Sequence, residues 1–315
     1  MKLRIRLHVG FAIVLAGLSA AIPVSAQNVA MAWMRPDARQ GDGPVLPHTV
    51  PSSPEPVCGI EHLVLCIQDL GSDEKGIFTS PFRLRPEDSY WLMPLGAATG
   101  LAFAYDAEAS ATLGVDQNRT NAANHISDFG SYYATGAESA GVYFLGLSRR
   151  NSKLSETGRL SAEAILASGT VALTIKMAAN RQRPLQGGGQ GNFWPDGTRH
   201  WSLDSSFPSD HAAASMAMAR VFAGEYPQWY VAVPAYGFAE AVGISRILAN
   251  QHFPSDVLVG QTIGFLSGGY VLRHHARYCR GGKKTRIASV LDSVAPVANP
   301  QAHAMGISMQ IPFGQ

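Results

Sequence analysis

Three short blocks between residues 176 and 256 carry residue types that can bind and attack a phosphate group. The first block has Lys176, Arg183 seven residues later, and Pro184 directly after it. On a helix this spacing is about two turns, so both cations would project from nearly the same face. Arg183 can bind a phosphate through two parallel hydrogen bonds, whereas Lys176 supplies a point charge. The alternative is a pair of cations that extend to solvent at a helix end.

The second block, Pro208-Ser209-Asp210-His211, comes directly before an alanine-rich segment that is predicted to be helical. Ser209 suits the N-cap position of this helix. The backbone N–H groups of Asp210 and His211 would then face an anion, and the helix dipole would add to the attraction. An ordinary serine cap followed by a surface histidine is the alternative.

The third block joins Ser245-Arg246, at the end of one predicted helix, to His252 and Asp256, at the start of another. Pro254 fits the first helical position, so Asp256 falls near N3, where its carboxylate can reach back toward His252. A carboxylate on one imidazole nitrogen fixes the tautomer and makes the other nitrogen more basic. A structural histidine–aspartate pair is the alternative.

Together the blocks supply three cations, two histidines and a carboxylate. This inventory can bind a tetrahedral oxyanion, attack it with an imidazole and protonate the leaving group. A metal centre is less favoured, because His211 and His252 lack ligand partners at HxxxH or CxxC spacing. We therefore interpret the protein as a phosphatase that works through a phosphohistidine and expect no metal.

The blocks, in this order, resemble the signature of the superfamily that joins the type-2 phosphatidic acid phosphatases, the class A bacterial acid phosphatases and the vanadium haloperoxidases. That signature is Lys-x6-Arg-Pro, then Pro-Ser-Gly-His, then Ser-Arg-x5-His-x3-Asp, and this sequence departs from it only at Asp210, which replaces the glycine. The motif-bearing resemblance covers about residues 160–275. A weaker likeness extends back to about Ser72.

The resemblance implies a role for each matching residue. His252 would be the nucleophile that takes the phosphoryl group, and Asp256 would orient it. His211 would protonate the leaving alcohol and then activate water. The phosphate oxygens would be bound, and their developing charge neutralised, by Lys176, Arg183, Ser209, the backbone of Asp210, and Arg246. The phosphatase branch implies no cofactor, with vanadate as an inhibitor; vanadate as a cofactor belongs to the haloperoxidase alternative.

The departure at Asp210 needs its own explanation. A carboxylate beside bound phosphate would repel it unless the side chain turns away or pairs with a cation. Arg199, in the preceding loop, is one candidate partner. Because the backbone N–H of Asp210 remains available, we predict that Asp210→Gly retains activity.

The elements that position these blocks are predicted to be all-α: a bundle of about six core helices, with a flexible N-terminal leader and a C-terminal β-hairpin as a candidate. Residues 60–67 are predicted to be a short strand or one helical turn, and Ser72 is predicted to cap a helix. The core helices are expected over residues 89–105, 124–148, 161–179, 209–224, 229–247 and 254–275.

The predicted domain organisation begins with a signal peptide at residues 1–26, because a basic start, an apolar stretch and small residues before position 27 are typical of secretion. The remaining parts are a flexible leader, a helical phosphatase domain, and a tail or hairpin, over residues 27–57, 58–280 and 281–315. The protein is therefore expected outside the cytoplasm, in the periplasm or secreted. Cys58 and Cys66 could then form a disulfide.

The charge and composition of the chain limit the kinds of partner that it is expected to bind. A net charge of +2 gives no indication of nucleic-acid binding. Charged residues make up 15% of the chain, below the typical value of about 25%, which favours an alanine- and glycine-rich core or membrane contact. No predicted helix has a full uncharged apolar span, so a soluble or peripheral bundle is favoured and an integral membrane protein is the alternative. The oligomeric state is left open.

Several functions are compatible with this reading. The substrate is a phosphate ester, either a lipid phosphate or a soluble compound, and apolar helices with the loop aromatics Phe193, Trp194 and Trp201 favour an apolar one. A basic run that begins at Arg273 suits either a solvated helix end or anionic head groups. The alternatives are a vanadium haloperoxidase, a non-catalytic phosphate or phospholipid binder, and a phosphotransferase.

Overall fold

The computed structural model describes residues 63–83, 86–195 and 203–277, together with residues 294–299 and 304–309. The predicted signal peptide and leader lie outside the described residues, as do Cys58, Arg199 and Trp201. Cys66 is disulfide-bonded. The proposed partner, Cys58, is not among the described residues, so the pairing stays a prediction.

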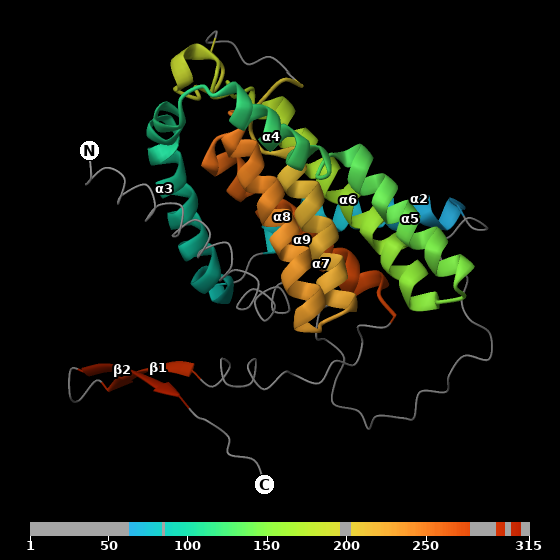
Figure 1. The fold of residues 1–315 in the computed structure, drawn as a ribbon. Coiled ribbons are helices and arrows are strands. Elements are labelled where there is room, and N and C mark those ends of the chain that lie inside the picture. Colours follow the sequence, from blue (N-terminus) through green and yellow to red (C-terminus); the bar gives the residue numbers. More distant parts are fainter. Residues whose placement is uncertain (1–62, 84–85, 196–202, 278–293, 300–303, 310–315) are drawn as a thin grey trace. The chain divides into compact units, whose positions relative to one another are not determined.

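The predicted all-α fold class is confirmed, with eight α-helices in the described part of the chain instead of about six (Figure 1). In chain order they are α2 (Leu63–Thr79), α3 (Ser89–Leu113), α4 (Gln117–Asp128), α5 (Tyr132–Ser148), α6 (Ser152–Ala179), α7 (Asp210–Glu225), α8 (Trp229–Leu248) and α9 (Pro254–His275). Three short 3-10 turns, Ser80–Arg83, Pro86–Asp88 and Gly187–Gly189, connect some of them.

The start of the helical unit differs from the prediction. Helix α2 is continuous from Leu63, so residues 63–67 are helical, which is one of the two predicted alternatives, and the predicted helix start at Ser72 is wrong. Ser72 lies inside α2, where its hydroxyl donates to the carbonyl of Asp69 at 2.8 Å. A serine followed by acidic residues resembles a cap, but the hydroxyl can equally well bond back within a helix.

Side-chain caps explain two other differences. The predicted helix over residues 124–148 is two helices, because the Ser131 hydroxyl accepts the N–H of Ala134 at 3.2 Å and starts α5 there. Helix α6 starts nine residues before the predicted position, because Asn151 caps it and accepts the N–H of Leu154 at 3.0 Å. The boundaries of α7, α8 and α9 agree with the prediction to within one residue.

Helix α7 lies at the centre of the bundle and packs against α6, α8 and α9 (Figure 1). Helix α5 packs on α6, α4 on α8, and α3 on α9. The core is built largely from small side chains of α7, which are fully or almost fully buried, among them Ala212, Ala213, Ala214 and Ala217. Small side chains let the neighbouring backbones approach closely, as predicted.

The closest approach is between α7 and α9. A Cβ atom on Gly260 would lie 2.4 Å from the carbonyl oxygen of Ser209, and one on Gly264 would lie 2.1 Å from that of Ala213. The Ser209 N–H donates to the Asp256 carbonyl at 3.0 Å. The glycines of α9 therefore bring the second and third blocks of the sequence side by side.

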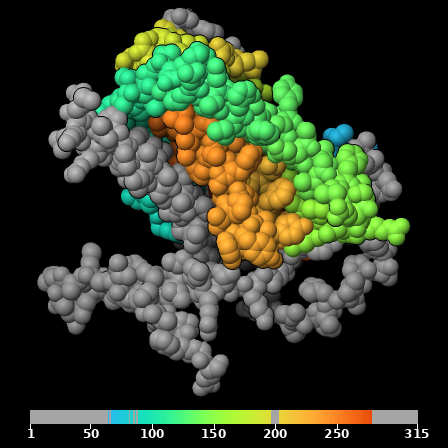
Figure 2. Space-filling view, in the orientation of Figure 1, coloured from blue at the N-terminus to red at the C-terminus, as the bar shows by residue number. Residues whose placement is uncertain are grey.

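Large apolar side chains are exposed on α4, α5 and α8, which lie together on the face shown in Figure 2. They include Ile126, Tyr133, Phe144, Trp229, Tyr230 and Val233. Among the described residues, α6 and α8 are long and apolar enough to cross a membrane, judged by length and composition alone.

The strands β1 (Val294–Asn299) and β2 (Ala304–Met309) form an antiparallel pair in which Val294 faces Met309 and Asn299 faces Ala304. They belong to a separate compact unit of the chain. They lie within the segment where a terminal hairpin was predicted.

Candidate active site

The first block lies at the end of α6 and just beyond it. Lys176 is in the last turn and is buried, as is Arg181. The helix ends at Ala179, and Asn180 then adopts a left-handed conformation with φ 40° and ψ 55°. The spacing had predicted that Lys176 and Arg183 share one helix face. They do not, because Arg183 lies beyond the turn that ends the helix. Its guanidinium donates to Asp204 at 3.0 Å and to the Gln251 carbonyl at 3.2 Å.

The carboxylate of Asp210, at the first position of α7, forms an ion pair with Lys176. The suggested partner, Arg199, lies outside the described residues. Burial alone would raise the pKa of Asp210, but the charge and hydrogen bond of Lys176 outweigh it and lower that pKa. Asp210 is therefore a carboxylate in this site and neutralises a buried cation.

Two hydrogen-bonding groups of the site have no partner among the described residues: the Ser209 hydroxyl and the Nε of Arg246. Ser209 is fully buried and occupies the predicted N-cap position of α7, but its hydroxyl does not cap the helix. Arg246, in the last turn of α8, donates through Nη1 to the Ser127 hydroxyl at 3.1 Å. Unpaired buried donors each cost about 1–3 kcal/mol, so both are suited to an anionic ligand.

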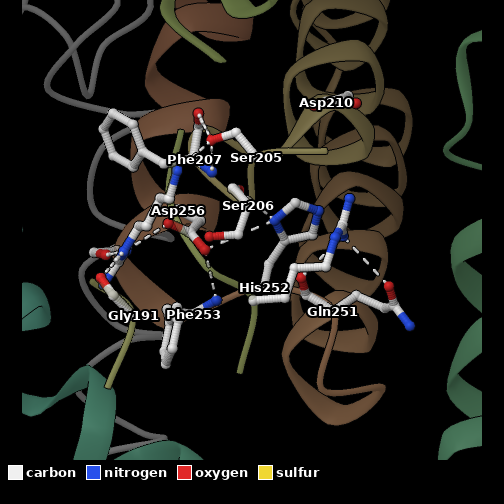
Figure 3. A network of polar contacts seen from close by, with 12 residues as sticks. Gly191, Ser205, Ser206, Phe207, Asp210, Gln251, His252, Phe253 and Asp256 are labelled. Carbon is white, nitrogen blue, oxygen red and sulfur yellow. Dashed lines mark hydrogen bonds and ion pairs between the residues drawn. The ribbon is translucent and has the colours of Figure 1, made fainter. Parts of the chain in front are cut away.

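His252 is 2% exposed and lies between the ends of α8 and α9. Its Nδ1 is 2.6 Å from the carbonyl oxygen of Ser206, whereas the Asp256 carboxylate is 3.7 Å away (Figure 3). A carbonyl only accepts, so Nδ1 carries the proton and Nε2 does not. Asp256 therefore lies beside the imidazole, within ion-pair distance, as predicted, but the hydrogen bond that holds the tautomer is accepted by the backbone carbonyl of Ser206.

The electrostatics of the site keep both imidazoles neutral. Burial, followed by the charges of Arg246, Lys176 and Arg183, holds the pKa of His252 well below its ordinary value. Burial, followed by the charge of Arg246, lowers the pKa of His211 to about 3. All three predicted cations therefore lie within electrostatic range of His252. The site combines a neutral imidazole with a surplus of positive charge.

Asp256 is fully buried, and each of its two carboxylate oxygens accepts a hydrogen bond. Its Oδ2 accepts the N–H of Phe253 at 2.8 Å, and its Oδ1 accepts from Arg181 at 2.5 Å. Pro254 at the first helical position and Asp256 at N3 are as predicted. Burial raises the pKa of Asp256 to about 6, and the charge of Arg181 opposes that rise.

Sequence reasoning missed Arg181, Asp106 and Ser206. Arg181 lies in the spacer of the first block, and Asp106 follows directly after a long uncharged stretch of α3. Two signals in the sequence could have suggested that Asp106 and Arg181 pair. Asp106 is a single carboxylate at the end of an apolar run, and Arg181 is a further cation close to Arg183. The contact made by the Ser206 carbonyl comes from the backbone, so no residue type reveals it.

Residues 159–278, which contain all three blocks, match the profile of the PAP2 superfamily. This segment is therefore similar to members of the PAP2 superfamily. The predicted resemblance is confirmed there, and helices α2 to α5 lie outside the matched segment.

The chain is also similar to curated proteins. The chain is 43% identical to the lipid A 1-phosphatase of Porphyromonas gingivalis over 81 residues, or 25% of this chain and 17% of that protein. It is 31% identical to the lipid A 1-phosphatase of Rhizobium johnstonii over 39% of this chain and 54% of that protein. It is 30% identical to the lipid A 1-phosphatase of Rhizobium etli over 43% of this chain and 62% of that protein. The chain thus spans less than two thirds of the length of each of these relatives.

Among solved structures, LpxE of Aquifex aeolicus is similar, with a TM-score of 0.40 and 23% identity. The similarity covers 54% of this chain and 95% of that chain.

Proposed function

We propose that this protein is a phosphatase that hydrolyses a phosphate monoester through a phosphohistidine on His252. The observation that carries the proposal is the hydrogen bond from His252 Nδ1 to the Ser206 carbonyl at 2.6 Å. It leaves the Nε2 lone pair of a neutral imidazole as the nucleophile, in a site surrounded by cations.

In the proposed first step, Nε2 attacks phosphorus and the bond to the leaving alkoxide breaks. Lys176, Arg183 and Arg246 neutralise the charge that develops on the phosphate oxygens, and the Ser209 hydroxyl donates to one of them. In the second step, water attacks the phosphohistidine and releases orthophosphate, and the electrons of the N–P bond return to Nε2. The two unpaired donors of the free site support this assignment, because a bound phosphate would satisfy both.

His211 is proposed to move the protons. With a pKa of about 3 it is neutral in the free site, because burial and the charge of Arg246 disfavour the imidazolium. A bound phosphate dianion would offset those charges and let His211 take up a proton. The imidazolium could then protonate the leaving alkoxide, and the neutral ring could accept a proton from the attacking water.

The proposed reaction uses no metal ion or organic cofactor, because the three basic side chains supply the positive charge that the transferring phosphoryl group needs. Vanadate, a tetrahedral oxyanion of similar shape, is expected to compete with the substrate. No observation in the site favours the haloperoxidase alternative over hydrolysis.

We further propose that the substrate is a lipid phosphate and that the protein works at a membrane, outside the cytoplasm. Three similar curated proteins are lipid A 1-phosphatases. The exposed apolar side chains of α4, α5 and α8, and the length and composition of α6 and α8, fit contact with lipid. Lipid A 1-phosphate is therefore the first substrate to test.

The test is phosphate release by the full chain, in mild detergent, from three substrates: a soluble aryl phosphate, a short-chain phosphatidate and lipid A. The matched control is His252→Asn, which keeps a polar side chain of similar size but has no nucleophilic nitrogen. The proposal is supported if phosphate release requires His252 and if a phosphorylated histidine can be trapped by rapid quenching without acid. A folded protein that releases phosphate from none of the three, or a fully active His252→Asn variant, would refute it.

A further inference from the structure

Arg181 forms an unusually complete set of contacts for a residue in the spacer of a motif. Its side chain is 3% exposed. The guanidinium donates to the Gly191 carbonyl at 3.0 Å, to the Ser255 hydroxyl at 2.8 Å, to Asp256 at 2.5 Å and to Asp106 at 2.8 Å. Arg181 therefore joins α3, the glycine-rich loop and the start of α9.

The backbone of Arg181 leads to His252 by a second route. Its carbonyl accepts the N–H of Ser206 at 2.8 Å, and the carbonyl of Ser206 accepts the Nδ1–H of His252 at 2.6 Å. The Arg181 N–H donates to the Ser205 hydroxyl at 2.9 Å. Arg181 thus holds both groups that flank the imidazole: the Ser206 residue through its backbone and the Asp256 carboxylate through its side chain. Figure 3 shows Ser206 and Asp256 beside the ring of His252.

Asp106 fixes the guanidinium from the other side. One carboxylate oxygen accepts from Arg181, and the other accepts the N–H of Ser255 at 3.1 Å. The Ser255 hydroxyl bonds the same Asp106 oxygen that Arg181 does. Asp106 is 1% exposed and belongs to α3, outside the segment that matches the family.

Aromatic rings enclose the guanidinium. Its central carbon lies 5.0 Å from the ring centre of Phe103, 5.1 Å from that of Phe193 and 4.4 Å from that of Phe253. The Phe193 ring packs on Arg181 and also on the Phe103 ring. In such surroundings charges interact strongly, but desolvation offsets most of the gain, so the network is poorly suited to adding stability.

We infer that Arg181 and Asp106 are positioning residues for the reaction: they fix Asp256 and the Ser206 backbone around His252 and thereby set the tautomer and direction of the nucleophile. This inference rests on the proposed function of His252. A purely structural alternative is that the network only connects α3 to α9. The two differ in whether losing Arg181 changes the titration of the site or only its stability.

The charged groups that face Asp256 determine that titration. They are Arg181 and His252; Asp106 pairs with Arg181, and around the imidazole lie Lys176, Arg183, Arg246 and Asp210. The cation of Arg181 lowers the pKa of Asp256, which burial raises to about 6. Without that cation the carboxylate would protonate at a higher pH, so activity that depends on its charge would be lost earlier as pH falls.

The experiment is the pH profile of kcat/KM for the full-length protein and four variants. Arg181→Gln removes the charge, Arg181→Lys retains it, and Asp106→Asn loosens the guanidinium. Arg159→Gln is the matched control: it removes a cation of α6 that forms a similarly buried ion pair, with Glu163 at 2.6 Å, about five turns before Lys176. Using one substrate throughout cancels the titration of the substrate itself.

We expect Arg181→Gln to lower kcat by about tenfold or more, to change KM by less than about threefold, and to move the acidic limb up by about one pH unit. Arg181→Lys should leave that limb near its wild-type position. Arg159→Gln should lower the melting temperature but leave the acidic limb of the pH profile in its wild-type position. Wild-type kcat and profile in Arg181→Gln, or the same shift in Arg159→Gln, would overturn the inference.

If Arg181→Gln does not fold, Asp106→Asn decides: a loss of kcat of about tenfold at unchanged KM supports the inference, and wild-type kcat overturns it. A readout without catalysis separates this inference from the proposed function. Nitrogen NMR of labelled histidine, with His252 assigned through His252→Asn, should show an Nδ1-protonated ring in the wild type and a tautomer mixture in the folded Arg181 or Asp106 variants. An unchanged tautomer would overturn the inference even if the protein proved to have no phosphatase activity.

Discussion

Asp210 and Lys176 form an ion pair within the proposed phosphate site. The lysine is buried, whereas the carboxylate side chain is 31% exposed. The free site therefore supplies its own anion at a position where a phosphate oxygen would bind. A substrate has to compete with that carboxylate, which is absent where the family signature has glycine.

The first prediction concerns this competition. Asp210→Asn and Asp210→Gly should retain phosphatase activity to within about tenfold and should bind orthophosphate about tenfold more tightly, because Lys176 no longer has an anionic partner. Competitive inhibition by orthophosphate measures the effect. Asp204→Asn is the control, since Asp204 pairs with Arg183 but is 71% exposed, and exposed pairs contribute little. A loss of activity above about tenfold, or about 1.4 kcal/mol, would mean that the Asp210 carboxylate takes part in the reaction.

The second prediction separates stability from activity at Ser209. Its buried hydroxyl has no partner among the described residues, so Ser209→Ala should leave the free energy of unfolding unchanged or raise it by about 1 kcal/mol. Turnover should nevertheless fall by about tenfold or more, because the phosphate loses a donor. Denaturant unfolding and steady-state kinetics provide the two measurements.

Ser215→Ala supplies the comparison, because the Ser215 hydroxyl is buried in the same helix but donates to the His211 carbonyl at 2.7 Å. That variant should keep its turnover to within about threefold. Equal loss of turnover in both variants, or marked destabilisation by Ser209→Ala, would contradict a ligand-binding role for the Ser209 hydroxyl.

The third prediction follows from the low pKa of His211. Burial and the charge of Arg246 lower it to about 3, so His211 is neutral in the free protein above that pH. If a bound dianion raises this pKa, binding is accompanied by proton uptake, and affinity falls as pH rises through the pKa of the complex. Calorimetry with tungstate, a tetrahedral dianion that does not titrate near neutral pH, in buffers of different ionisation enthalpy counts the protons. His211→Gln should bind tungstate without this uptake, and equal uptake in both proteins would exclude His211 as the acid.

The sequence predicted which residues lie near one another better than it predicted which of them pair. The three blocks identified the cations, the histidines and Asp256, because residue types and spacing are visible in one dimension. The positions of Pro254 and Asp256 at the start of α9 were also predictable, since they follow from local helix capping. What could not be predicted was which carboxylate meets which cation, because that depends on how helices far apart in sequence pack.

Asp256 illustrates this limit. Its neighbour in sequence, His252, was the natural partner, yet Arg181 and the Phe253 N–H take both of its oxygens. The imidazole is bonded by the backbone of Ser206, and backbone contacts leave no mark in residue type. Likewise, Arg183 was expected on the helix of Lys176, but a left-handed residue at Asn180 ends that helix first. Asparagine tolerates the left-handed conformation, but an asparagine near a helix end does not by itself show that the helix stops there.

The last prediction tests whether close packing of α7 on α9 positions the site. A methyl group on Gly260 would lie 2.4 Å from the carbonyl oxygen of Ser209, a backbone atom that cannot move without moving the start of α7. Gly260→Ala should therefore destabilise the fold by about 1–3 kcal/mol and lower turnover by more than its loss of folded protein explains. Gly269→Ala, in the same helix, meets only the Arg220 side chain at 3.5 Å, so its stability should change by less than about 1 kcal/mol, with turnover unchanged. Thermal unfolding and turnover per folded molecule, measured for both variants, check the expectation. If Gly260→Ala folded normally and retained full turnover per molecule, the approach of the two helices would not be what places Ser209 beside Asp256.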